Sequence, residues 1–76
     1  MAPEIEILLN GERMAIPAVS TVEDLILILE LKRDQVAVEV NRSILKRDLW
    51  GEHFLEAGDA LEIVHFVGGG KESNDR

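Results

Sequence analysis

Cysteine is absent from this chain of 76 residues, and no apolar run is long. Without cysteine there is no disulfide, no thiolate metal site and no cysteine nucleophile, which suits a reducing compartment. The aliphatic run LILIL is far too short to cross a bilayer, and the N-terminus lacks the basic and apolar segments of a signal peptide. We therefore expect a cytoplasmic protein that has no membrane association.

Positive charge is also scarce. Eight lysines and arginines stand against fifteen aspartates and glutamates, so the formal net charge is −7. Such a surface repels a phosphate backbone, which argues against a nucleic-acid ligand. Hydrophobic residues make up 46% of the chain, which argues against disorder. The length fits one domain near the lower limit for a self-sufficient core.

The apolar pattern predicts several short strands. Alternating apolar and polar residues are typical of half-buried strands, and they occur at residues 4–10, 12–17, 36–41, 43–46 and 60–67. Asn10 and Gly11 predict a tight hairpin between the first two strands, because both residues tolerate a positive φ. In the last strand, Leu61 and Ile63 are expected to face the core, opposite Glu62, Val64 and Phe66.

One helix is predicted over residues 20–31. Ser20 and Glu23 match the S-x-x-E capping box, which marks a helix N-terminus. The helical spacing places one set of apolar residues on a single face: Val22, Leu25, Ile26 and Leu29. Leu27, Ile28 and Leu31 widen this stripe, which indicates either extensive burial or contact with a partner.

This order of elements predicts an α+β fold, a mixed sheet of four to five strands wrapping one main helix. After a helical crossover, the last strand can lie beside the first. Residues 1–67 form the expected domain, and residues 68–76 a flexible glycine-rich tail.

The sequence shows little sign of a catalytic or metal site. His53 and His65 lack the neighbouring ligands of a metal site. Ser20, Thr21 and Ser43 lack a nucleophile motif, and the three glycines precede no helix that could receive a phosphate. We therefore expect no catalytic residues, no metal and no intrinsic cofactor.

Two features point instead to a partner. If the first and last strands are neighbours, Leu8, Val64 and Phe66 form an apolar patch that leads toward the glycines, and such patches mark interaction sites. Trp50, the single tryptophan, is expected to cap the core, with an interface anchor as the alternative.

The glycines allow two readings. Residues without Cβ make a thin thread that can enter a narrow channel and leave a terminal carboxylate accessible. The alternative is a flexible linker before a disordered tail.

Taken along the chain, these segments resemble the ThiS family, the sulfur carriers of thiamine biosynthesis in the ubiquitin-like β-grasp superfamily. The segments that carry the resemblance are LLNGE, TVEDLILIL, VAVEVNRSILKRDLW, AGDALEIVHFV and the glycines. The spacing N-x-x-I-x-x-R-x-x-W followed by Gly-Asp is the most specific part, and its members are Asn41, Ile44, Arg47, Trp50, Gly58 and Asp59.

The resemblance implies a mechanism. A ubiquitin-activating-type (ThiF-like) adenylyltransferase would use ATP to adenylate the carboxylate of Gly70, which Gly69 precedes. A sulfur donor protein would then form a thiocarboxylate, and a ThiG-like thiazole synthase would receive the sulfur. The partner-binding segment would comprise Leu8, Val64, Phe66, Val67 and Gly68.

The chain departs from the family at its end, because Gly70 is joined by a peptide bond to Lys71 in the sequence KESNDR. We expect a precursor in which a protease cuts the Gly70–Lys71 bond; the alternative is a lineage that lost or altered the carrier role. Other candidate functions are a sulfur carrier for molybdopterin, cysteine or homocysteine synthesis, a ubiquitin-like modifier of lysines, and a plain binding module.

Overall fold

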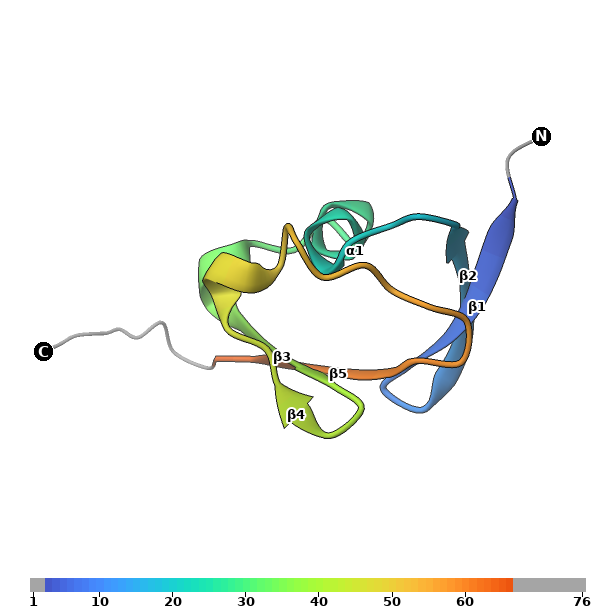
Figure 1. Cartoon of the computed structure of the whole chain (residues 1–76). Helices are drawn as coiled ribbons and strands as arrows, with labels where there is room; N and C mark the ends of the chain where they lie inside the picture. Colours follow the sequence, from blue (N-terminus) through green and yellow to red (C-terminus); the bar gives the residue numbers. More distant parts are fainter. Residues whose placement is uncertain (1–2, 67–76) are drawn as a thin grey trace, which may run out of the picture.

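The computed structural model describes residues 3–66. It shows a five-stranded mixed sheet with one helix packed on one face (Figure 1). The strands are β1 (Glu4–Leu9), β2 (Glu12–Pro17), β3 (Val36–Val40), β4 (Ser43–Ile44) and β5 (Ala60–His65). The helix is α1 (Val22–Ile28), and two 3₁₀ turns are η1 (Arg33–Gln35) and η2 (Arg47–Leu49). The expected mixed sheet around one main helix is thereby confirmed.

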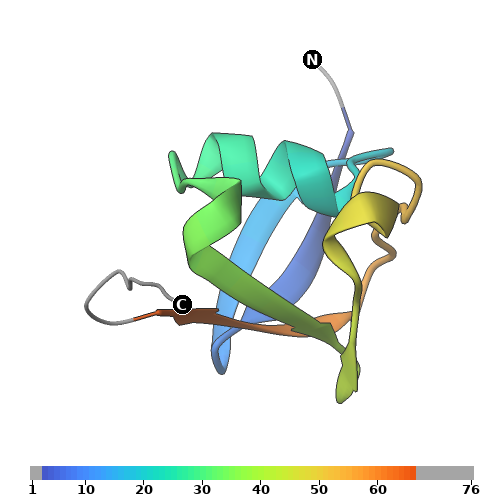
Figure 2. The ribbon, with the colours of Figure 1, turned by 90° about the vertical axis from the view of Figure 1, so that its left-hand side faces the viewer.

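β5 lies in the middle of the sheet, whose strand order is β2-β1-β5-β3-β4. It runs parallel to β1 and antiparallel to β3, while the pairs β1–β2 and β3–β4 are antiparallel. The first and last strands are therefore neighbours, as the crossover predicted. Figure 2 shows α1 above the sheet, with β5 running beneath it.

The core lies between α1 and the covered face of the sheet. Val22, Leu25 and Ile26 of α1 are buried, and the four long strands bury residues of one face against them. The buried strand residues are Ile7, Ile16, Val36, Val38, Val40, Leu61 and Ile63. Leu27 and Ile28 are exposed, so α1 buries one face only and the extensive burial considered for its wider stripe does not occur.

The helix begins one residue later than the sequence suggested. Thr21 is the N-cap: its hydroxyl accepts from the Asp24 amide at 3.1 Å, and an Asp24 carboxylate oxygen accepts from the Thr21 amide at 2.9 Å. Ser20 donates its hydroxyl to the Pro17 carbonyl at 2.5 Å, so the predicted Ser20–Glu23 box is wrong. An antiparallel bridge between Thr21 and Phe54 fixes this register, because it holds Thr21 extended before the first turn.

The helix also ends earlier than residue 31. Glu30 has a φ of 59°, and its amide donates to the Leu27 carbonyl while the Leu31 amide donates to the Ile26 carbonyl. This paired pattern is a Schellman motif, in which a left-handed residue closes the last turn. The apolar periodicity continues past this point, so it overstated the helix length.

Val19 is strained, and relief of that strain should stabilise the fold. A β-branched residue at a φ of 65° is unfavourable by about 1–2 kcal/mol, and its side chain is 77% exposed, so it contributes little packing. We expect Val19→Gly to raise the free energy of unfolding by about 0.5–1 kcal/mol, after the entropy of glycine in the unfolded chain is subtracted. Urea denaturation measures the change. Val19→Ala is the control, because alanine removes the branch and still disfavours this φ; equal stability of the two variants would contradict the interpretation.

Candidate functional site

The last residues of β5, together with Phe66 directly after them, present an apolar pair on the sheet face opposite the helix; these residues are called the end of β5 below. Leu61 and Ile63 point into the core, so the alternation of the strand directs Val64 and Phe66 outward, where they are 56% and 54% exposed. Val64 is opposite Ala37 of β3, whose small side chain leaves Val64 prominent. The Phe66 amide donates to the Gln35 carbonyl at 3.0 Å, which holds this end of the chain against η1.

Leu8 is also exposed on β1, but it lies further along the sheet. Its register partner on β5 is Ala60, four residues before Val64, which corresponds to about 13 Å along a strand. Glu62 and its cross-strand partner Glu39 lie between the two positions. The structure thus brings Val64 and Phe66 together and separates Leu8 from them. Periodicity identified the face of each residue, whereas only the register could give this offset.

The remaining predicted site residues lie outside the described part of the chain. Val67, Gly68, Gly69, Gly70 and Lys71 follow Phe66 directly.

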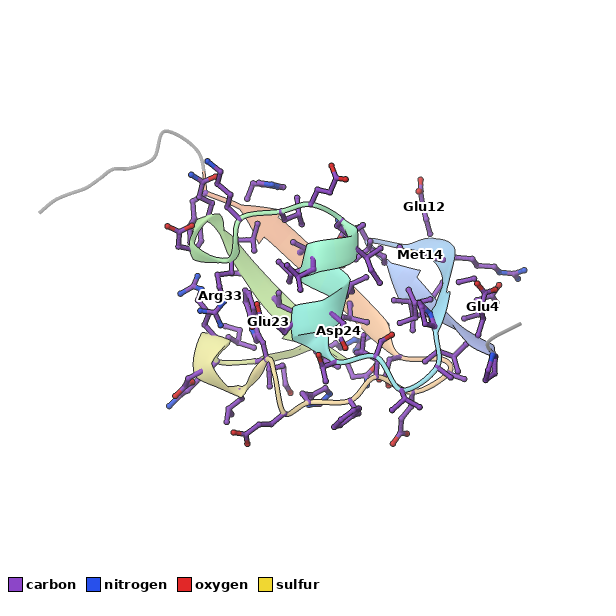
Figure 3. The ribbon with its side chains drawn as sticks, turned by 90° about the horizontal axis from the view of Figure 1, so that it is seen from above. Glu4, Glu12, Met14, Glu23, Asp24 and Arg33 are labelled. Carbon is purple, nitrogen blue, oxygen red and sulfur yellow. The ribbon has the colours of Figure 1, made fainter. Side chains whose placement is uncertain are left out.

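Trp50 belongs to the core and is 1% exposed. Its indole Nε1 donates to the Leu45 carbonyl at 3.0 Å, and the guanidinium carbons of Arg33 and Arg47 lie 5.5 and 5.4 Å from the ring centroid. Arg33 also pairs with Glu23 of α1 at 3.0 Å (Figure 3). Of the two readings of Trp50, the structure supports the core cap and not the exposed anchor.

Arg47 and Asn41, which belong to the same N-x-x-I-x-x-R-x-x-W motif as Trp50, also have structural roles. Arg47 donates to the carbonyls of Arg33 and Val36 at 2.6 and 2.8 Å, which ties η2 to η1 and to the start of β3. The Asn41 amide oxygen accepts from the Ala60 amide at 2.9 Å, and its Nδ2 donates to Asp59 at 3.0 Å. The spacing of the N-x-x-I-x-x-R-x-x-W motif is thus explained by side-chain hydrogen bonds that hold β3 and β5 in place.

Replacement of the indole donor should destabilise the fold. We expect Trp50→Phe to lower the free energy of unfolding by about 1–3 kcal/mol, because the Leu45 carbonyl loses a buried partner while most of the ring volume is kept. Circular dichroism during urea denaturation measures the loss. A change below about 0.5 kcal/mol, the range of ordinary surface substitutions, would contradict a structural role for this hydrogen bond.

No alternative site emerges from residues 3–66. His53 is partly buried and His65 exposed, and the described residues contain no group of three or more potential metal ligands. A shallow hollow lined by Leu45, Leu49, Glu52 and His53 is widely open to solvent. Among the same residues, no helix is long and apolar enough to span a membrane.

The architecture defines the class of protein. A mixed sheet that wraps one helix and carries its last strand in the centre is the ubiquitin-like β-grasp fold. The ThiS family model matches residues 7–70. The structure also superimposes on the crystal structure of the thiamine biosynthesis protein ThiS from Geobacter metallireducens with a TM-score of 0.76 and 28% identity, covering 87% of this chain and 100% of that one.

Two curated relatives agree with this match. The sulfur carrier protein ThiS of Escherichia coli is 29% identical over 66 residues, which is 87% of this chain and all of that protein. A thiazole synthase of Magnetococcus marinus is 39% identical over 67 residues, which is 88% of this chain and 21% of that protein. The chain therefore spans about a fifth of the thiazole synthase it matches. It belongs to the ThiS family of sulfur carrier proteins.

Proposed function

We propose that this chain carries sulfur for thiazole formation in thiamine biosynthesis, as a thiocarboxylate on Gly70. The observation that carries the proposal is the extent of the family match, which begins in β1 and ends at Gly70, immediately before Lys71. The exposed Val64 and Phe66 give a second support, because an apolar pair beside the reactive end suits a docking enzyme.

The chemistry requires little of the carrier itself. In the proposed first step, a carboxylate oxygen of Gly70 attacks the α-phosphate of ATP on a ThiF-like adenylyltransferase, and pyrophosphate leaves. A persulfide on a donor protein then attacks the acyl carbon, and AMP leaves. A thiol next attacks the donor sulfur of the resulting acyl disulfide and forms a disulfide with it, which releases the thiocarboxylate, and this passes to a ThiG-like thiazole synthase. ATP is thus the cofactor of the activating enzyme, and the carrier supplies an accessible carboxylate and a binding surface.

The thiazole synthase is the partner with the most specific support. The Magnetococcus marinus relative bears that name and contains a region similar to nearly the whole of this chain. A second thiazole synthase, from Paramagnetospirillum magneticum, is 37% identical over 71 residues. A carrier-like region within a thiazole synthase favours this acceptor over those of the molybdopterin, cysteine and homocysteine pathways.

Removal of KESNDR should allow adenylation of Gly70, because Gly70 has no free carboxylate while it is bonded to Lys71. We expect a chain that ends at Gly70 to give an acyl-adenylate with ATP and the ThiF-like enzyme of the same host, and the full chain to give none. Pyrophosphate release measures the reaction, and a chain that ends at Gly69 is the matched control for the position of the end. Equal adenylation of the full chain would contradict the precursor proposal.

Intact mass of the protein from its native host distinguishes the alternatives. The proposal expects loss of residues 71–76 and replacement of one terminal oxygen by sulfur when thiamine is withheld. Only full-length, unmodified chain under that condition would overturn it. A series of heavier, lysine-linked species would instead identify a protein modifier.

The docking face can be tested with two phenylalanines of equal exposure. Phe66 and Phe54 are both 54% exposed, and Phe54 lies in the loop that bridges to Thr21. In a chain that ends at Gly70, we expect Phe66→Ala to raise the KM for adenylation about fivefold or more, since truncation of an interface anchor typically costs over about 1 kcal/mol. Phe54→Ala should leave the KM unchanged. Equal effects of the two substitutions would contradict a docking role for the end of β5.

A further inference from the structure

Asn10 makes three hydrogen bonds to β5, on the side of that strand that faces β1. The sequence predicted only a turn at this residue. Its backbone amide donates to the Leu61 carbonyl at 2.9 Å. Its side-chain Oδ1 accepts from the Ile63 amide at 2.9 Å, and its Nδ2 donates to the Ile63 carbonyl at 3.4 Å. Only this orientation of the amide fits, because the Ile63 N–H needs an acceptor.

The Asn10 side chain bonds to β5 at a position where the backbone of β1 no longer pairs with it. The parallel pairing of β1 with β5 ends at Leu9 and Leu61, and Asn10 has a φ of 50° at the hairpin. In a continuing parallel strand, the backbone carbonyl of residue 10 would accept from the Ile63 amide. A carboxamide carries the same acceptor and donor as a peptide group, so Asn10 extends the ladder past the end of β1.

This contact lies immediately before the exposed end of β5. On the other side of the strand, β3 pairs with it as far as His65, and the Gln35 carbonyl holds the Phe66 amide. On the β1 side, the Asn10 side chain is the last hydrogen-bonding partner of β5 that the structure shows among residues 3–66.

We propose that Asn10 is a positioning residue, which fixes the end of β5 so that Val64 and Phe66 face the activating enzyme in one orientation. This inference rests on the proposed carrier function, because it is that function which gives the end of β5 a partner. In the proposed role, Asn10 contacts no reacting atom and acts through Ile63.

Asn41 provides a matched control within the same chain. It has the same φ of 50°, lies in the turn between β3 and β4, and holds β5 by the same kind of bond, from the Ala60 amide to its Oδ1 at 2.9 Å. It does so at the opposite end of β5. Glycine suits this φ at both positions, so Asn→Gly removes the side-chain bonds and leaves the turn geometry favourable.

Amide hydrogen exchange of the full chain, followed by NMR, tests the structural half of the proposal. We expect Asn10→Gly to speed exchange of the Ile63 amide about fivefold beyond any change in global unfolding, since one net hydrogen bond corresponds to about that factor. Asn41→Gly should instead speed exchange of the Ala60 amide and leave that of Ile63 unchanged. Unaltered exchange at Ile63 in Asn10→Gly would overturn the proposal.

Adenylation kinetics of the same variants, in chains that end at Gly70, test the functional half. We expect Asn10→Gly to raise the KM severalfold with kcat unchanged, and Asn41→Gly to leave both unchanged at a similar loss of stability. An equal rise in KM for both variants would show a merely structural role and overturn the proposal. If the chain with neither substitution is not adenylated, the proposed function fails, while the exchange contrast still decides whether Asn10 holds β5.

Discussion

The position of β5 in the middle of the sheet is the constraint on which the rest of the molecule depends. On the β3 side its pairing runs from Leu61 to His65, but on the β1 side the backbone ladder ends at Leu61. The hairpin after Leu9 makes this shortfall unavoidable, because β1 turns back while β5 continues. The side chain of Asn10 compensates by pairing with Ile63. β5 is thereby hydrogen-bonded on both edges as far as Ile63.

Hydrophobic periodicity was sufficient to predict the sheet, the single helix and the faces of β5. It fails where two neighbouring sequence patterns compete. Ser20 with Glu23 and Thr21 with Asp24 both resemble a capping box, and the bridge from Thr21 to Phe54 decides between them. That bridge joins residues far apart in the chain, so no local pattern contains it.

The sequence predicted the candidate site to about the same extent as the fold. Alternation identified Val64 and Phe66 as exposed, and the crossover identified β1 as a neighbour of β5. The offset of Leu8 depends on the register of a parallel pair, which is set by the length of the connection and the packing of the core rather than by either strand alone. The second role of Asn10 was hidden for the same reason, since its partner Ile63 lies across the sheet.

Structural and proposed functional residues occupy different parts of this chain. Trp50 and its two arginines link α1, η1 and η2, and Asn41 fixes the start of β5. These residues give the sequence its recognisable spacing, yet they face inward or bond to the chain itself. Among residues 3–66, the open face at the end of β5 carries the exposed apolar pair Val64 and Phe66. An internally bonded body with an exposed apolar pair at one strand end suits the proposed role, in which the enzymes that bind the chain perform the chemistry. The selectivity of such a carrier would then depend on how firmly that strand end is oriented, which places more weight on a turn asparagine than its exposed position suggests.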